Sequence, residues 1–179
     1  MSEAARPPRR LIVLRHAKSD WPAGVPDKDR PLARRGRRDA PAAGRWLAEH
    51  VGRLDLVVLS DARRTRETWE ALEPELTAGG GRAGEVRPSS RVYEADAKTL
   101  VDVLRAVPDD VGTVLLVGHN PGVQDLVVDL AGRDSQSGSA LAAAKFPTSG
   151  MAVLSLAGPW SGLGGKPRAV LEDFVVPRG

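Results

Sequence analysis

Hydrophobic residues form two kinds of pattern along the chain. Short runs of consecutive apolar residues indicate strands that are covered on both faces, because such strands need no polar side. These runs predict strands at residues 11–14, 55–60, 113–117, 151–156 and 169–176, with a shorter one at 91–93. Between the runs, apolar residues recur at the spacing of one helix face. This spacing predicts helices at residues 40–49, 63–76, 97–107 and 122–131.

Several residues mark where these helices begin. Asp96 is a residue type that caps a helix N-terminus, and Ser60 or Asp61 can cap the helix that follows the second strand. Pro121 suits the opening turn of a helix. Pro41 must lie near a helix start or introduce a kink, since proline lacks the amide hydrogen of a helix interior.

The segments that fit neither pattern predict loops. Residues 21–29 contain three prolines or glycines and leave the first strand beside its C-terminal end. Residues 79–89 start with three glycines and predict a flexible surface loop, and residues 134–147 predict a small, polar loop or lid. The alternation of strands and helices, followed by two strands, indicates an α/β protein. We expect a three-layer α/β/α sandwich with a mostly parallel mixed central sheet, closed by an antiparallel ribbon.

Length and composition are those of one ordinary globular domain, with 179 residues, 41% hydrophobic and 27% charged. We expect a single domain over residues 11–179 after a disordered tail over residues 1–10. The chain has no cysteine, which excludes disulfide bonds, thiolate metal ligands and a cysteine nucleophile. Only four apolar residues follow the basic start, too few for a signal peptide or a membrane span. We therefore expect a cytoplasmic protein without a membrane partner, and we expect a monomer.

Arginines are concentrated at residues 30–38 and 63–66. The 23 acidic residues leave a formal charge of only +3, so these stretches fit a solvated helix face, a phosphate-attracting rim or a nucleic-acid patch. Aromatic residues, which stack on bases, do not interleave with these arginines, and Tyr93 is the only tyrosine. We therefore expect no nucleic-acid partner.

Two of the three histidines come just after predicted strands. Arg15 and His16 follow the apolar run at 11–14, and His119 follows the run at 113–117. In open α/β sheets, ligands bind beyond the carboxyl ends of the strands, so these residues are candidates for one site. The third histidine, His50, ends a predicted helix, where it complements the helix C-terminus, and we expect no further function for it.

Five motifs occur in order along nearly the whole chain, each at a strand or helix end. They are Leu14-Arg15-His16, Arg30-Pro31-Leu32 with Gly36, the segment from Ser60 to Thr68, Gly118-His119-Asn120-Pro121 and Pro147-Thr148. This set resembles the histidine phosphatase superfamily, and within it the small phosphohistidine phosphatase branch, the SixA-like proteins. The resemblance implies a phosphoglycerate mutase-like fold. The short connections leave little sequence for the large cap of members that act on small metabolites, so we expect no large cap.

The family's second arginine lies in a frame of serine, three variable residues, arginine, two more residues, then glutamine and threonine. Residues 60–68 fit this frame with Arg64 in the arginine position. Asp61 stands where the family has proline, and Glu67 stands where it has glutamine. The spacing favours Arg64 and leaves Arg63 as the alternative.

The resemblance implies that His16 becomes phosphorylated and is then hydrolysed by water, while Arg15, Arg64 and His119 hold the phosphoryl group. The chemistry of these residue types agrees, since phosphoryl transfer depends on positioning and charge complementarity. Arginine never deprotonates, and its fork can hold two oxygens. His16 must be neutral to attack, and nearby arginines disfavour the imidazolium. A backbone carbonyl that accepts from one ring nitrogen would leave the other nitrogen free as the nucleophile. No metal and no cofactor is implied.

An alcohol leaving group normally needs a general acid. Glu94, Asp20 and Asp29 are the candidates, of which we prefer Glu94. A phosphohistidine substrate relaxes this need, because imidazole leaves easily near neutral pH. The sequence therefore predicts a metal-independent phosphatase acting on phosphohistidine in a protein, with a small phosphorylated molecule as the alternative substrate.

Lys18, Ser19 and Asn120 are expected on the loops that line the phosphate site, although a plain loop role fits Lys18 and Ser19 equally well. Two other functions compete with the phosphatase. His16 and His119 could be ligands of a metallohydrolase, but the adjacent arginine would repel the metal and no acidic cluster shares these loops. The chain could also be a phosphate-binding module that kept the fold and lost turnover.

Overall fold

The computed structural model describes residues 6–166 and 168–179. The strands are β1 (Arg9–Arg15), β2 (Arg53–Ser60), β3 (Arg82–Ser89), β4 (Thr113–Gly118), β5 (Met151–Leu156) and β6 (Val170–Val175). The α-helices are α1 (Arg34–His50), α2 (Arg63–Ala78), α3 (Ala97–Arg105), α4 (Gly122–Ala131) and α5 (Gln136–Ala143). Two 3-10 turns are η1 (Asp27–Asp29) and η2 (Trp160–Gly162). Within the described residues, no helix is long and apolar enough to cross a membrane.

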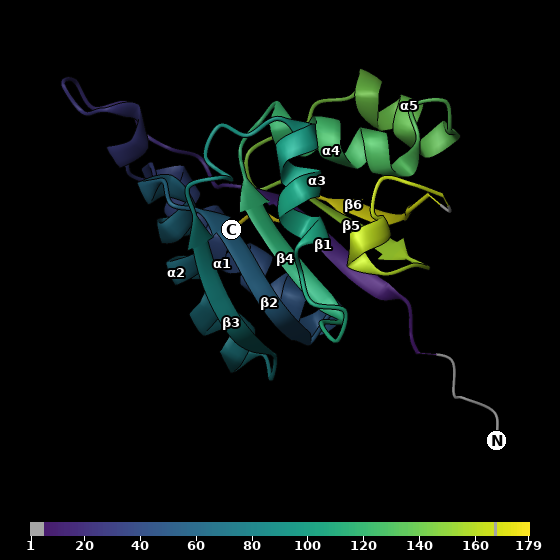
Figure 1. Cartoon of the computed structure of the whole chain (residues 1–179). Coiled ribbons are helices and arrows are strands. Elements are labelled where there is room, and N and C mark those ends of the chain that lie inside the picture. The colour runs from purple at the N-terminus through teal and green to yellow at the C-terminus, as the bar shows by residue number, and fades with distance from the viewer. Residues whose placement is uncertain (1–5, 167) are drawn as a thin grey trace.

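The six strands form one sheet in the order β3-β2-β4-β1-β5-β6. Strands β1 to β4 pair in parallel, whereas β5 pairs antiparallel with both β1 and β6. Figure 1 shows α1 and α2 on one side of this sheet and α3, α4 and α5 on the other. The predicted three-layer sandwich, its mostly parallel mixed sheet and its antiparallel closing ribbon are confirmed.

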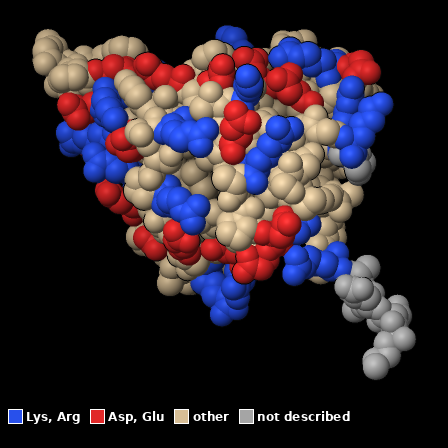
Figure 2. All heavy atoms as spheres, in the orientation of Figure 1, with Lys and Arg blue, Asp and Glu red and all other residues tan. Residues whose placement is uncertain are grey.

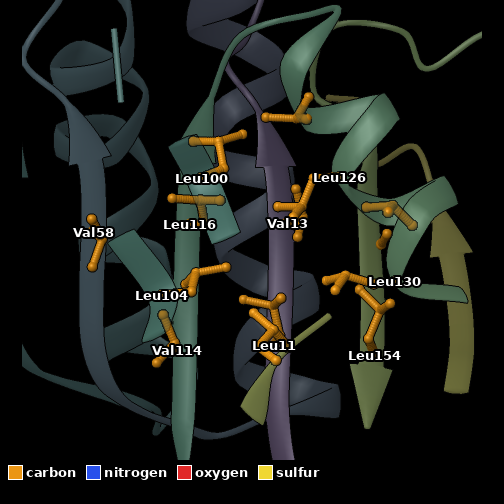
Figure 3. Close-up of a cluster of buried hydrophobic side chains, with 14 of the residues drawn as sticks. Leu11, Val13, Val58, Leu100, Leu104, Val114, Leu116, Leu126, Leu130 and Leu154 are labelled. Atoms are coloured by element: carbon orange, nitrogen blue, oxygen red, sulfur yellow. The ribbon is translucent and has the colours of Figure 1, made fainter. Parts of the chain in front are cut away.

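Both faces of the sheet are buried because successive side chains of a strand point to opposite sides. In β1, Leu11 and Val13 face α3 and α4, and Ile12 and Leu14 face α1 and α2. Figure 3 shows the first face, where side chains of the strands meet Leu100 and Leu104 from α3 and Leu126 and Leu130 from α4. An uninterrupted apolar run is therefore what the central strand requires.

Three predicted segments differ from the structure. Residues 82–89, expected to be part of a loop, form the edge strand β3, which pairs in parallel with β2. Its side chains are mostly exposed, so it lacks the apolar run by which buried strands are recognised. The strand expected at residues 91–93 is a turn instead. Residues 136–143, expected to be a loop or lid, form α5, whose Leu141 packs into the core over α4.

The first helix starts earlier than its apolar spacing predicts. Helix α1 begins at Arg34 and contains Pro41 in its interior. In the first turns of α1, Gly36 packs directly against the backbone of Lys18. Close backbone packing, rather than an apolar stripe, therefore stabilises these turns. Helix α2 is capped by Ala62 without a side-chain hydrogen bond, so neither Ser60 nor Asp61 is the N-cap. The predicted cap at Asp96 is confirmed, and Pro121 directly precedes α4, as its predicted place at the opening of a helix requires.

The expected disordered tail over residues 1–10 lies partly outside the described residues, which begin at residue 6. Inside the described part, Arg9 and Arg10 belong to β1 rather than to a tail. Arg10 pairs with Thr113 of β4 on one side and with Ser155 of β5 on the other. Pairing with two neighbouring strands extends β1 beyond its apolar run. The local sequence does not reveal this extension, because it depends on strands that are distant in the chain.

Candidate active site

The parallel pairing of β1 and β4 brings the two candidate histidines together. Arg15 lies opposite Gly118, so His16 and His119 leave neighbouring strands at the same edge of the sheet. The His16 amide donates a hydrogen bond to the Gly118 carbonyl at 3.0 Å. The two imidazole centroids are 5.2 Å apart.

A pocket of about 270 Å³ opens at this edge. Its lining includes all eight residues predicted for the site, namely Arg15, His16, Lys18, Ser19, Arg64, Glu94, His119 and Asn120. They come from the end of β1 and the loop after it, from the loop after β4, from the start of α2 and from the turn before α3. Residues far apart in sequence therefore share one cavity, as expected at the carboxyl edge of an α/β sheet.

Four further lining residues were not predicted for the site: Trp21, Asp27, Arg30 and Thr148. Three of them belong to the segment of residues 20–31, here called the rim loop, which Ser19 and Leu32 close with an antiparallel bridge. Irregular backbone carries no periodic pattern from which the direction of a side chain can be predicted. The motifs that contain Arg30 and Thr148, and the predicted position of the loop over residues 21–29 beside the end of the first strand, were the signals available for these residues.

His16 is held in one orientation as a neutral base. Its Nδ1–H donates to the Ala17 carbonyl at 2.7 Å, which leaves Nε2 unprotonated. Burial is the main cause that lowers the pKa of His16 from 6.5 to about 3. The charges of Arg64 and Arg15 act in the same direction, and the hydrogen bond to Ala17 opposes part of this shift. The expected backbone acceptor is confirmed, and at neutral pH the ring carries a free lone pair on Nε2.

His119 is also neutral at pH 7. Burial is the main cause that lowers its pKa from 6.5 to about 4, followed by the charge of Arg64. Its Nε2 lies 2.7 Å from the Ser60 hydroxyl, and that hydroxyl accepts a hydrogen bond from the Ala62 amide at 3.1 Å. The Ser60 hydroxyl can therefore donate its proton to Nε2 of His119. This hydrogen bond favours the His119 tautomer that carries its proton on Nδ1. In the described part of the chain Nδ1 is buried without a partner, so it can donate to an incoming oxygen.

The structure brings Arg64, not Arg63, into the pocket. The Arg64 side chain is 5% exposed, whereas the Arg63 side chain is 50% exposed and pairs with Glu67 at 2.6 Å. Helical spacing explains the difference, since neighbouring residues on α2 point about 100° apart. The frame of the family motif therefore selected the right arginine.

Asp27 on the rim loop binds this arginine. The terminal nitrogens of Arg64 donate to the Asp27 carbonyl at 2.7 Å and to its carboxylate at 3.1 Å. The Tyr93 hydroxyl donates to the same carboxylate at 2.6 Å and is the largest cause that lowers the pKa of Asp27 to about 2, followed by Arg30 and Arg64. Asp27 is therefore ionised at neutral pH, where it cannot serve as a general acid.

The acid candidates differ in position. Glu94 lines the pocket in a left-handed backbone conformation, with φ of 50°. Asp20 and Asp29 lie on the rim loop but do not line the pocket. His50 lies far along α1, where its ring stacks on Trp46 with centroids 4.3 Å apart.

The loop residues have defined partners. The Ser19 hydroxyl accepts a short hydrogen bond from Arg30, and the Asn120 amide nitrogen donates to the Phe146 carbonyl at 3.0 Å. Arg15 donates to the same carbonyl at 2.9 Å. Among the described residues, no group of three or more His, Asp or Glu side chains is arranged to hold a metal ion. Four cationic residues line the pocket against two carboxylates, so the pocket favours an oxyanion.

The chain is similar to known proteins over most of its length. The model of the histidine phosphatase superfamily (branch 1) matches residues 11–98. An uncharacterized protein of Mycobacterium tuberculosis (strain H37Rv) is 42% identical over 171 residues, covering 92% of this chain and 100% of the relative. The phosphohistidine phosphatase SixA homolog of Haemophilus influenzae is 27% identical over 129 residues, covering 69% of this chain and 77% of the relative. The solved structure of a SixA protein from Nakamurella multipartitia is 34% identical, covers 96% of this chain and 99% of that chain, and has a TM-score of 0.80.

Proposed function

The chain belongs to the histidine phosphatase superfamily, in its SixA-like branch, and is a phosphatase. We propose that it removes phosphoryl groups from phosphohistidine side chains of proteins. The state of His16 carries the proposal. Its ring is buried and neutral, and its hydrogen bond to Ala17 leaves Nε2 for the phosphorus atom. Such a group is a nucleophile that needs no separate base.

In the first step, Nε2 of His16 attacks phosphorus and the bond between phosphorus and the substrate nitrogen breaks. The electron pair of that bond stays on the substrate nitrogen. Arg15, Arg64 and the Nδ1–H of His119 surround the pocket and can neutralise the charge on the transferring oxygens. Since Asp27 uses only two of the five N–H groups of Arg64, donors remain for the phosphoryl group.

In the second step, water attacks the phosphorus atom on His16. The bond between phosphorus and Nε2 breaks, its electron pair returns to Nε2, and the water oxygen becomes the fourth phosphate oxygen. One of the two water protons stays on the phosphate as hydrogen phosphate, and the other is released to bulk water. His16 is then ready for another cycle. The protein supplies orientation and charge throughout, which are the main contributions to phosphoryl-transfer catalysis.

The leaving group supports phosphohistidine as the substrate. Near neutral pH, the ring nitrogen that does not carry phosphorus takes up a proton, so the substrate ring leaves as neutral imidazole. An ester would need a proton from the enzyme, but Asp27 is ionised and Asp20 and Asp29 lie outside the pocket. Glu94 is the remaining carboxylic acid that could serve esters. We also propose, from the sequence, that the protein acts as a cytoplasmic monomer.

The test compares phosphate release from a phosphohistidine peptide and from an aryl phosphate, with excess chelator present. Wild type and His16→Ala are measured side by side. We expect activity that survives the chelator, favours the peptide and is lost in the variant. Acid-labile, alkali-stable labelling of wild type but not of His16→Ala would identify the phosphohistidine intermediate.

Other outcomes separate the alternatives. Higher kcat/KM on the aryl phosphate would favour a small phosphomonoester as the substrate. Loss of activity with chelator would favour a metallohydrolase. Phosphate binding without turnover on either substrate would favour a silent binding module.

A further inference from the structure

The rim loop ends in an uncharged tip that stands out from the molecule. Figure 1 shows the loop after β1, in dark purple, extending beyond the rest of the chain at the upper left. The tip has the sequence Trp-Pro-Ala-Gly-Val-Pro over residues 21–26. Figure 2 shows this corner without charged atoms at its end, although charges cover much of the neighbouring surface. Trp21 is 71% exposed and, in the described chain, only Val170 is another large hydrophobic residue classed as exposed.

The tip is held in place rather than loosely attached. Arg30 lies under the loop, 6% exposed, and donates to the Asp20 carbonyl at 2.9 Å and to the Asp27 carboxylate at 2.8 Å. Its guanidinium carbon is 3.2 Å from the centroid of the Trp21 ring, which places a cation against the aromatic face. Compact loops closed at their ends and packed on their own side chains are frequently functional.

The rim loop also connects the tip to the active site. Trp21 and Arg30 line the pocket, and Asp27 binds Arg64 through its carbonyl and its carboxylate. Residues 22–25 lie beyond the pocket and are not part of its lining. A substrate that fills only the pocket cannot reach these residues, whereas a larger one, with its phosphoryl group near His16, can cover them.

We propose that the rim loop is a docking arm, whose tip packs against apolar side chains that flank the phosphohistidine on a protein substrate. This inference rests on the proposed function. An ordered, exposed tryptophan loses little conformational entropy on binding, which is why aromatic residues dominate the energetics of many interfaces. Such an arm distinguishes substrates by the side chains that flank the phosphohistidine. The phosphate pocket contacts only the phosphoryl group and cannot distinguish substrates in this way.

The charges beside the tip favour a protein over a lipid surface. Asp20 and Asp29 flank the tip in sequence and would repel anionic headgroups, whereas membrane-binding loops usually carry basic residues. Lys28, the basic residue between them, is already paired with Asp61 at 2.8 Å.

The experiment uses two synthetic peptides of equal length with a single phosphohistidine, flanked by leucines in one and by serines in the other. Free phosphohistidine is the reference substrate, and kcat/KM is measured for all three. We expect wild type to prefer the leucine peptide by about five- to tenfold, the effect of one partly buried apolar contact. Ala23→Asp should abolish this preference and leave free phosphohistidine unchanged.

Two further variants complete the comparison. Trp21→Ala should lower the ratio of kcat/KM for the leucine peptide to kcat/KM for free phosphohistidine, and Trp21→Phe should restore much of it. Val170→Ala, which removes an exposed hydrophobic side chain on β6, should behave as wild type.

The outcomes separate the docking arm from the activity itself. If wild type hydrolyses no phosphohistidine substrate, the proposed function fails and the docking arm with it. If wild type hydrolyses both peptides equally well, or if Ala23→Asp keeps the preference, the phosphatase stands and the docking arm is wrong. Equal loss of all three activities in Ala23→Asp would instead show that the tip maintains the structure of the pocket and does not bind the flanking side chains. Binding to phosphatidylcholine–phosphatidylglycerol vesicles that Ala23→Asp abolishes, with no peptide preference, would assign it to membranes.

Discussion

At the scale of the residue, neighbouring side chains on α2 have different environments although their chemistry is the same. Arg64 is buried and bound to Asp27, whereas Arg63 is on the surface beside Glu67. A guanidinium aimed at the transferring phosphoryl group stabilises the transition state, and an exposed one has no such role. The position of each side chain on its helix therefore decides its contribution.

We expect Arg64→Ala to lower kcat/KM for phosphohistidine by about 100-fold or more, as for the loss of one donor to a developing anion. The matched variant Arg63→Ala should change kcat/KM by less than about threefold, because an exposed pair contributes little. Steady-state kinetics on the peptide substrate would check both. A larger loss in Arg63→Ala would reverse the assignment.

The two site histidines make stability depend on pH. Burial is the main cause that lowers the pKa of His16 from 6.5 to about 3 and that of His119 from 6.5 to about 4. At pH values between about 4 and 6.5, the unfolded chain therefore binds more protons than the folded chain. The free energy of unfolding should therefore fall as pH falls from about 6.5 towards 4. Asp27, with a lowered pKa of about 2, affects stability only below its ordinary value of 3.8, outside this window.

Urea unfolding at pH 7 and pH 4.5 would test this dependence. The double variant His16→Asn/His119→Asn should lose less stability than wild type between these two pH values. His50→Asn, at an exposed position on α1, serves as the control and should follow wild type. An unchanged pH dependence in the double variant would contradict the buried neutral state of the two rings.

At the scale of the element, close backbone packing determines how α1 meets the site. The start of α1 lies against the carbonyl of Lys18, two residues after His16 in the chain. Only a residue without a side chain fits at Gly36, because a Cβ there would overlap the Lys18 carbonyl oxygen. The glycine of the family motif therefore has a steric reason.

Gly36→Ala should lower the free energy of unfolding by about 1–3 kcal/mol, the cost of overpacking a tight contact. It should also lower kcat/KM, since the displaced backbone is that of the catalytic loop. Gly158→Ala is the control, because its Cβ would enter open space. Denaturant unfolding and peptide kinetics would measure both effects, and equal behaviour of the two variants would show that the contact can relax freely.

At the scale of the whole molecule, the C-terminal residues tie α1 to the pocket loop. The Arg178 guanidinium donates to the Asp39 carboxylate at 3.0 Å and to the Thr148 carbonyl at 2.9 Å. Asp39 is buried, and its carboxylate also accepts from the Gly179 amide at 3.2 Å. Arg178 therefore joins the C-terminus, α1 and the loop of Thr148, which lines the pocket.

Arg178→Ala should lower the free energy of unfolding by about 1–3 kcal/mol, because a buried carboxylate loses a charged partner. The surface variant Arg133→Ala, which breaks an exposed pair with Asp129, should cost less than about 1 kcal/mol. Thermal and urea unfolding would measure both. Similar losses in the two variants would mean that Arg35, which already lies 3.4 Å from the Asp39 carboxylate, is a sufficient partner.

The sequence by itself determined the features that local patterns encode. Apolar runs predicted the central strands. Because Arg15, His16 and His119 directly follow two of these runs, the sequence also predicted that they lie at one edge of the sheet. The frame around Arg64 predicted which arginine enters the site. Buried strands and motif spacings are recognisable because each needs particular residue types at fixed separations.

Only the tertiary structure decided what depends on contacts between distant segments. Strand β3 forms because β2 offers an edge to pair with, although its own side chains remain mostly exposed. The approach of Asp27 to Arg64 and Tyr93 depends on how an irregular loop folds back over the sheet. No local periodicity encodes such contacts, because they arise when the whole chain packs and the buried charges find partners.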